Sequence, residues 1–278
     1  MWSRNRVVPH TRAMGRGRAT LLLFALLASA CGESRGTLVT TGTTPWRPAL
    51  GTSWQVQLTG TLDTSIDVAV YDVDLFDTPA SAVEALHGAG RRVICYVSVG
   101  TYEPWRSDAT QFSSTALGDT VEGFPTERWL DPRDTTVRAV MSARLDVAVA
   151  KACDGVDLSN VSPEGAATGF SFGTADVESY GGWLAGQAHA RGLGAGLGGG
   201  ADVAGSLATD FEWALTEGCL GDGTCGAYAG FAAAGKVVFG VEIGAEADAA
   251  AICPAAKQAG LDALIKDRNY DAFRVACP

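Results

Sequence analysis

The stretch VRAVMSARLDVAVAKACDGVDL, residues 137–158, contains the unit from which the fold is built. Residues 137–152 are predicted to form a helix, and the short apolar run 155–158 that follows is predicted to be a strand. A second pair comes directly afterwards, with a helix expected over 175–190 and a strand over 194–197. Strands that are apolar throughout and alternate with helices are typical of a parallel sheet covered on both faces.

The same alternation extends over most of the chain. Further strands are expected at 54–58, 68–72, 93–97, 213–216, 237–241 and 263–265, and further helices at 80–88, 228–234 and 247–259. Eight strands in roughly 235 residues favour an α/β fold of the (β/α)8 TIM-barrel type, in one domain. An open doubly wound sheet is the alternative, but no dinucleotide-binding motif follows the first strand. Gly198-Gly199-Gly200 lacks the downstream lysine of a phosphate loop, so we interpret it as a bare turn.

The first 30 residues have the composition of an export signal. Five arginines precede the apolar run 21–30, no acidic residue comes before Glu33, and the run is too short to span a membrane. We therefore predict that residues 1–30 are a signal peptide, with Met14 as an alternative start.

Cys31 follows Leu27-Ala28-Ser29-Ala30, a sequence that resembles a bacterial lipobox. We expect Cys31 to carry a lipid, the alternative being an ordinary signal peptide with a cysteine at its cleavage site. Residues 31–45 are then a flexible tether and residues 46–278 the barrel domain. The expected product is a cell-envelope lipoprotein or a secreted protein, which contacts a membrane only through its lipid.

The charge is unevenly distributed along the chain. The whole sequence has 21 basic and 31 acidic side chains, a formal charge of −10 and a mean hydropathy of +0.11. These values argue against a disordered acidic chain and against a nucleic-acid-binding protein, which needs a basic surface. Loss of the five arginines in residues 1–30 leaves 16 basic against 31 acidic side chains, a charge of −15. Such a surface favours a cationic partner, and we expect a monomer.

Six cysteines remain when Cys31 is set aside, and an even number in an exported chain predicts three disulfides. The connectivity is open; one pairing joins Cys95 with Cys153, Cys219 with Cys225, and Cys253 with Cys277. A zinc site is the rival interpretation. No cysteine pair has two-residue spacing, and only His87 and His189 follow the signal, so we expect no metal and no cofactor.

In a TIM barrel the chemistry lies at the C-terminal ends of the strands. Five of the eight expected strands have a carboxylate at or just past this end. The polar residues there are Gln57, Asp72, Asp74, Ser98, Tyr102, Glu103, Asp157, Ser159, Asn160, Glu217, Glu242 and Lys266. Any one acid can simply cap the following helix. Several acids on one rim can supply the acid and the base of glycoside hydrolysis.

Aromatic residues near the same rim are candidates for stacking on sugars. We predict sugar contacts for Trp46, Trp54, Tyr102, Trp105 and Trp129, and core packing for Trp183 and Trp213.

Several ordered motifs together resemble glycoside hydrolase family 114. They are WQVQL at 54–58, YDVDLFD at 71–77, VICYVSVG at 93–100, EPWR at 103–106, WLD at 129–131 and CDGV at 153–156. The resemblance runs from about Trp46 to Cys277. It implies a barrel enzyme with endo-α-1,4-polygalactosaminidase activity, acting on an α-1,4-linked galactosamine-containing polysaccharide.

The resemblance also implies two catalytic acids, one of which is replaced. The family typically has Asp-Gly-Val-Glu-Pro-Asp-Asn where this chain has DGVDLSN at 154–160, so the second acid of the motif falls on Ser159. The family's Lys-Asn falls on Gly198 and Gly199. The other acid, before the strand-six cysteine, is retained as Glu217.

A serine cannot act as a carboxylate, so Glu217 needs another partner. Asp157 points to the same side as Ser159 but lies about 6.6 Å deeper along the strand. Glu242, Asp72 and Asp74 are further candidates.

Two functions follow as expectations. The first is a glycoside hydrolase with Glu217 as general acid and Asp157 or Glu242 as base or nucleophile. The alternative is a sugar-binding envelope lipoprotein whose chemistry is lost because Ser159 replaces the acid; a purely structural envelope protein is a third. For the first two, the partner is a cationic, partly deacetylated polysaccharide. The residues predicted to bind it are Asp72, Asp74, Tyr102, Glu103, Trp105, Ser159 and Asn160.

Overall fold

A computed structural model describes residues 44–278 of the chain. The predicted signal peptide, the predicted lipidation site Cys31 and nearly all of the predicted tether lie outside the described residues. Within residues 44–278, no helix combines the length and the apolar character that are needed to cross a membrane.

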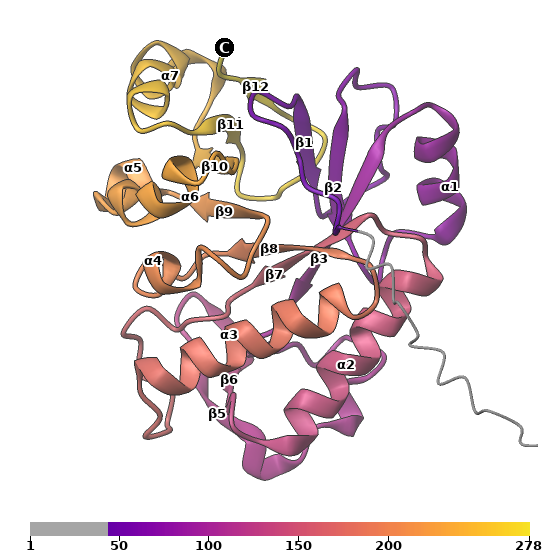
Figure 1. Cartoon of the computed structure of the whole chain (residues 1–278), viewed down its shortest axis with the longest axis vertical. Coiled ribbons are helices and arrows are strands. Elements are labelled where there is room, and N and C mark those ends of the chain that lie inside the picture. Colours follow the sequence, from indigo (N-terminus) through magenta and orange to yellow (C-terminus); the bar gives the residue numbers. More distant parts are fainter. Residues whose placement is uncertain (1–43) are drawn as a thin grey trace, which may run out of the picture. The chain divides into compact units, whose positions relative to one another are not determined.

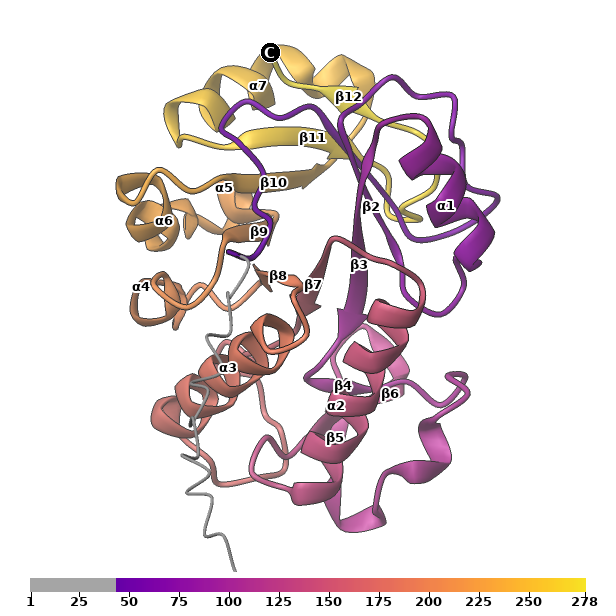
Figure 2. The same ribbon diagram turned by 45° about the vertical axis from the view of Figure 1, so that its right-hand side comes forward.

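A curled sheet forms the centre of the described unit, and helices surround it (Figures 1 and 2). Eight strands run parallel in chain order, and the short strand β12 pairs antiparallel with the last of them. The strands are β1 (Trp54–Gln57), β2 (Val70–Asp74), β3 (Arg92–Ser98), β7 (Gly155–Ser159), β8 (Gly194–Gly198), β9 (Trp213–Glu217), β10 (Val238–Ile243), β11 (Asp262–Lys266) and β12 (Val275–Ala276). The fold is therefore a mixed α/β, TIM-barrel-like fold.

The helices lie outside the sheet, between successive strands (Figure 2). They are α1 (Ala80–Gly88), α2 (Thr135–Ala150), α3 (Thr174–His189), α4 (Ala204–Leu207), α5 (Cys219–Asp222), α6 (Ala229–Ala233) and α7 (Ala249–Gln258). All eight predicted strands and all five predicted helices are confirmed, within two residues at each end. The connection from β1 to β2 contains no helix, so the β/α repeat is incomplete there.

The segment between β3 and α2 contains three strands that were not predicted from the sequence. It forms a separate antiparallel sheet of β4 (Thr101–Tyr102), β5 (Leu117–Val121) and β6 (Phe124–Leu130). Glu122 and Gly123 make the two-residue turn between β5 and β6, and Gly123 has a φ of 81°, as a tight hairpin turn requires.

No ladder joins β1 to β11, and single hydrogen bonds link β1 to the C-terminal part of the chain instead. The Trp54 indole nitrogen donates to the Asp262 carbonyl at 3.0 Å, and Arg274 donates to the Trp54 carbonyl at 3.0 Å. Leu58 donates its backbone N–H to the Tyr270 carbonyl at 2.8 Å.

Three disulfides cross-link the described unit. They join Cys95 with Cys153, Cys219 with Cys225, and Cys253 with Cys277, which confirms the pairing considered from the sequence. The first ties β3 to the residues just before β7, the second closes the turn after β9, and the third ties α7 to the C-terminal end of the chain.

The inner face of β8 consists of glycines because the Trp213 indole fills the space beside them. Trp213 is completely buried, as predicted. A Cβ added at Gly196 would overlap the Trp213 indole nitrogen, and one added at Gly194 would come within 3.0 Å of its six-membered ring. At Gly198 an added Cβ would overlap the Asp157 carboxylate and the Ser159 hydroxyl. The large Trp213 side chain of β9 therefore fills the interior of the sheet beside β8, and the glycines of β8 leave room for it.

This packing predicts that Gly196→Ala destabilises the protein. The new methyl group cannot be accommodated without moving a fully buried indole, so we expect a loss of about 1–3 kcal/mol or more in the free energy of unfolding, measured by urea denaturation. Gly186→Ala is the control, since Gly186 is exposed on α3 and an added Cβ meets no atom within 4 Å. The free energy of unfolding of that variant should increase by up to about 1 kcal/mol. Equal losses in both variants would contradict the packing argument.

Candidate functional site

A cavity of about 420 Å³ lies at the C-terminal ends of the parallel strands, and we call it the central cavity. Strands β7, β8 and β9, the β5–β6 hairpin and the loop after β11 all contribute to its lining. The lining residues with polar or aromatic side chains are Tyr96, Thr101, Phe124, Glu127, Trp129, Ser159, Asn160, Ser162, Glu164, Thr216, Glu217, Asp222, Thr224, Tyr228, Arg268 and Tyr270. The opening therefore lies where a TIM-barrel fold carries its chemistry.

The central cavity is acidic. Glu127, Glu164, Glu217 and Asp222 line it, against Arg268 as the one basic side chain in the lining. Glu217 is exposed to the solvent in the cavity, although protein atoms enclose most of its surroundings. This partial burial raises the pKa of Glu217, and the neighbouring Tyr270 phenol opposes the rise. A carboxyl group of this kind can hold a proton closer to neutral pH than a surface glutamate can.

Two further carboxylates lie buried beneath the cavity. The Ser159 hydroxyl donates to one Asp157 oxygen at 3.0 Å, while the other Asp157 oxygen and both oxygens of Asp72 have no hydrogen-bond partner. Burial raises the pKa of Asp157 to about 7; the Ser159 hydrogen bond opposes this rise, and the Glu217 charge adds to it. Burial and then the Asp157 charge raise the pKa of Asp72 well above its ordinary value. The structure thus places Ser159 in the cavity wall and Asp157 and Asp72 behind that wall.

The raised pKa of Asp157 predicts a pH-dependent stability difference. Between about pH 4 and pH 7 the unfolded chain releases this proton while the folded chain keeps it, so the folded state loses stability as the pH rises through this window. Asp157→Asn removes this titration. The change that the substitution makes to the free energy of unfolding should therefore be more stabilising above pH 7 than at pH 4, by up to about 4 kcal/mol. Urea denaturation at both pH values measures the difference. Glu84→Gln, on the exposed face of α1, should leave the pH dependence of stability unchanged. If Asp157→Asn and the wild type differ in stability by the same amount at both pH values, the raised pKa of Asp157 is refuted.

Glu242, a predicted catalytic residue, does not line the central cavity. Its neighbours along β10, Val241 and Phe239, belong to the apolar cluster inside the sheet, so Glu242 points to the opposite face. Its carboxylate accepts the backbone N–H of Leu220 at 3.1 Å at the start of α5. This hydrogen bond gives Glu242 a structural role at the start of α5, on the face of the sheet that does not carry Glu217.

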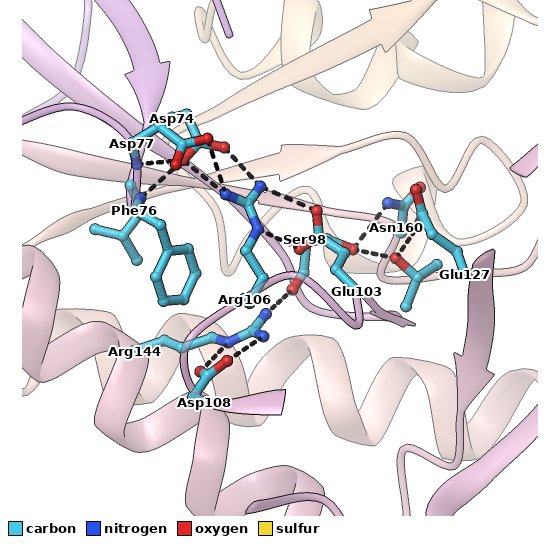
Figure 3. A network of polar contacts seen from close by, with 12 residues as sticks. Asp74, Phe76, Asp77, Ser98, Glu103, Arg106, Asp108, Glu127, Arg144 and Asn160 are labelled. Carbon is cyan, nitrogen blue, oxygen red and sulfur yellow. Dashed lines mark hydrogen bonds and ion pairs between the residues drawn. The ribbon is translucent and has the colours of Figure 1, made fainter. Parts of the chain in front are cut away.

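Asp74 and Glu103, predicted to bind the substrate, are held in buried ion pairs. Figure 3 shows Arg106 between them, with Asp74 on one side of the guanidinium and Glu103 on the other. Arg106 donates to Asp74 at 2.6 and 2.9 Å and to Glu103 at 2.9 and 3.0 Å. All three side chains are buried. The structure does not bring Asp74 or Glu103 to the central cavity.

A second network in Figure 3 positions two groups of the cavity wall. Arg144, paired with Asp108, donates to the Ser98 carbonyl at 2.7 Å. Asn160 donates to the Ser98 hydroxyl at 3.0 Å. The Thr101 hydroxyl donates to Glu127 at 2.9 Å, so in the 2.6 Å contact between Ser98 and Thr101 the serine is the donor. Asn160 and Glu127 are therefore fixed by one chain of hydrogen bonds.

The predicted sugar-stacking residues separate into three groups. Trp129 lines the central cavity, together with Phe124, which the sequence analysis did not single out. Trp105 is exposed but lies outside the cavity, and Tyr102 packs edge-to-face on Phe112 at 5.8 Å. The predictions for Trp46 and Trp54 are wrong. Trp46 packs on Trp213, and Trp54 is buried against Phe239, because both side chains complete the apolar interior of the sheet.

Sequence reasoning missed the residues that reach the cavity from loops. Tyr270 lines it beside Glu217; its hydroxyl is buried without a regular hydrogen bond, and its φ of 52° is unusual for a tyrosine. Asp222 and Thr224 lie between the two cysteines of the short disulfide loop. The close spacing of Cys219 and Cys225 could therefore have pointed to these two residues. Arg268 gave no signal in the sequence. Within residues 44–278, no three His, Cys, Asp or Glu side chains are grouped as metal ligands.

The comparisons with known proteins agree with the family resemblance. The sequence model of Glycoside-hydrolase family GH114 matches residues 36–278. The crystal structure of Aspergillus fumigatus Ega3 in complex with galactosamine is 36% identical in sequence, with a TM-score of 0.80 over 84% of this chain and 98% of that chain. The glycoside hydrolase domain of PelA from Pseudomonas aeruginosa is 13% identical, with a TM-score of 0.65 over 81% of this chain and 98% of that chain, which supports the fold alone. No curated protein matches the chain. Because the family model covers most of the sequence, the chain belongs to glycoside hydrolase family GH114.

Proposed function

We propose that this protein binds a galactosamine-containing polysaccharide in the central cavity, beside Glu217. The observation that carries the proposal is the lining, in which four carboxylates accompany a single guanidinium. Galactosamine that is not acetylated carries an ammonium group at neutral pH. Carboxylates in a partly enclosed cavity attract such a cation more strongly than carboxylates on an open surface. The presence of galactosamine in the solved relative of 36% identity supports the same sugar here.

The uncharged groups of the lining suit the rest of a sugar ring. Ser159, Asn160 and Thr216 offer hydroxyl and amide groups to its hydroxyls, and Trp129 and Phe124 offer apolar faces. A site of this kind combines aromatic surface with a few placed polar groups.

The arrangement supports binding better than hydrolysis. Glycoside hydrolysis needs a proton donor and a second carboxylate beside the scissile bond. Glu217, with its raised pKa, suits the role of donor. The wall residue Ser159 has no carboxylate, and Asp157 behind it is buried. Hydrolysis is the second candidate function, favoured because the charge of Glu217 acts on Asp157 and adds to the rise of its pKa. Glu217 would then be the general acid and Asp157 the base or nucleophile.

Calorimetric titration with a deacetylated galactosamine oligosaccharide at pH 7 tests the proposal. Wild-type protein should bind it, and Glu217→Gln should bind at least about tenfold more weakly because one charge of the cavity is lost. Glu84→Gln removes one charge from an exposed position outside the cavity and should bind like the wild type. Equal affinity of Glu217→Gln and wild type would refute this site. Release of reducing ends by the wild type, absent in Glu217→Gln, would establish the second candidate.

We also propose that the protein acts outside the cytoplasm, as an envelope lipoprotein or in secreted form. The signal-like residues 1–30 and Cys31 support this location. The three disulfides add independent support, because such bonds persist in oxidising compartments.

A further inference from the structure

A second cavity adjoins the central one on the side of the β7–α3 connection. It measures about 460 Å³, and its lining consists of residues between 162 and 177 together with Asp202. Ser162 and Pro163 belong to the walls of both cavities. We call it the Phe170 cavity. The two cavities therefore share part of one wall, which places them next to each other.

The Phe170 cavity offers the two contacts that an amino sugar needs. Phe170 and Phe172 stack with their ring centroids 6.3 Å apart, and both rings are only half-buried. Aromatic faces pack against the apolar face of a sugar ring and attract a nearby ammonium group. The Arg133 guanidinium already lies 5.9 Å from the Phe172 ring centroid, so Phe170 is the ring that is offered to the ammonium group. Asp202 is exposed in the same wall, where its carboxylate accepts the Ser162 hydroxyl at 2.9 Å. That hydrogen bond orients the carboxylate without neutralising its charge.

The loop that forms this cavity is held in place before any ligand arrives. Asp119 of β5 donates its backbone N–H to the Thr168 carbonyl at 2.8 Å. A Cβ added at Gly118 would overlap that carbonyl, so strand and loop are in close contact. The Ser162 hydroxyl accepts the Glu164 backbone N–H at 3.1 Å. A preformed cavity binds without the cost of ordering a loop.

We propose that the Phe170 cavity is a separate sugar subsite, which binds an amino-sugar unit of the same polysaccharide chain whose neighbouring units occupy the central cavity. Phe170 and Phe172 contact the ring, and Asp202 pairs with the ammonium group. This inference rests on the proposed function. It adds that affinity increases with the length of the oligosaccharide until both cavities are filled.

The test compares short and long ligands. Calorimetric titration with a galactosamine disaccharide and with an octasaccharide should show at least about tenfold tighter binding of the octasaccharide by the wild type. Asp202→Asn keeps the acceptor for Ser162 but removes the charge, and Phe170→Leu keeps apolar bulk but removes the aromatic face. Each variant should weaken octasaccharide binding about fivefold and leave disaccharide binding unchanged. Glu84→Gln should bind both ligands like the wild type.

The outcomes separate this inference from the proposed function. If Glu217→Gln weakens the binding of both ligands while Asp202→Asn and Phe170→Leu change neither, the Phe170 cavity is not a subsite, and the central site stands. If the wild type binds neither ligand, the proposed function fails and this inference fails with it. A thermal melt of each variant checks that the fold is retained. Because the two variants change different side chains, the test still works if one of them misfolds.

Discussion

Ser159→Asp is expected to raise hydrolysis of deacetylated galactosamine polymer by a factor on the order of 10² to 10⁴ above the wild type. Residue 159 ends β7 in the wall of the central cavity, and Glu217 ends β9 in the same wall. An aspartate there returns the second acid of the family motif. The neighbouring Gly198 has no side chain, which leaves room for the longer group. The chemical requirement for two carboxylates is then met by groups that both line the cavity.

Release of reducing ends, measured at fixed enzyme and polymer concentration, gives the rate. Glu217→Gln added to Ser159→Asp should abolish the gain, because the proton donor is then missing. Thr224→Asp is the control, since it adds a carboxylate at a different position of the cavity wall, one that is exposed. If Ser159→Asp binds the sugar like the wild type and releases no reducing ends, the missing chemistry lies elsewhere in the site.

Arg106→Met is expected to cost about 3–5 kcal/mol of the free energy of unfolding. The methionine has a similar length but no charge, so Asp74 and Glu103 are left buried without their cationic partner. Removing one member of a buried ion-pair group is costly because the desolvated charges that remain are uncompensated. The cation–π contact of Arg106 with Phe76, at 4.9 Å, is lost as well.

Urea denaturation measures this loss. Arg91→Met is the control, because the partner of Arg91 is Asp67, whose side chain is 90% exposed, and such pairs contribute at most about 1 kcal/mol. Adding Asp74→Asn and Glu103→Gln to Arg106→Met should recover part of the stability, since the unpaired charges are then gone. Equal losses for Arg106→Met and Arg91→Met would contradict a structural role for the Asp74–Arg106–Glu103 group.

The sequence predicted the sheet well because a strand buried on both faces leaves a continuous apolar run. Strands such as Val93–Val97 and Val237–Val241 needed no knowledge of their partners. The β5–β6 hairpin was missed because half of its strand residues are exposed and polar and apolar types are mixed along it. Its one local signal was Gly123 at the turn.

The candidate site was harder to predict, because proximity to a strand end does not give the direction of a side chain. Glu217 and Glu242 both lie near the ends of their strands, yet pairing of β9 with β10 aligns Glu217 with Val241, so Glu242 points to the other face. The ion pairs of Asp74 depend on Arg106, 32 residues further along the chain, and no local pattern reveals that contact. Asp157 and Ser159 were expected on one side with Asp157 deeper, and the structure shows this arrangement.

The glycine at position 198 also constrains the order of sequence change. The family resemblance places a lysine there and an aspartate at residue 159, in register on adjacent strands. In this protein the Ser159 hydroxyl and the Asp157 carboxylate occupy the place of any Cβ at residue 198. A lysine introduced first therefore meets a steric clash, whereas an aspartate introduced first at residue 159 does not require the lysine. Residue 159 of β7 is therefore the starting point for directed evolution of activity in this scaffold.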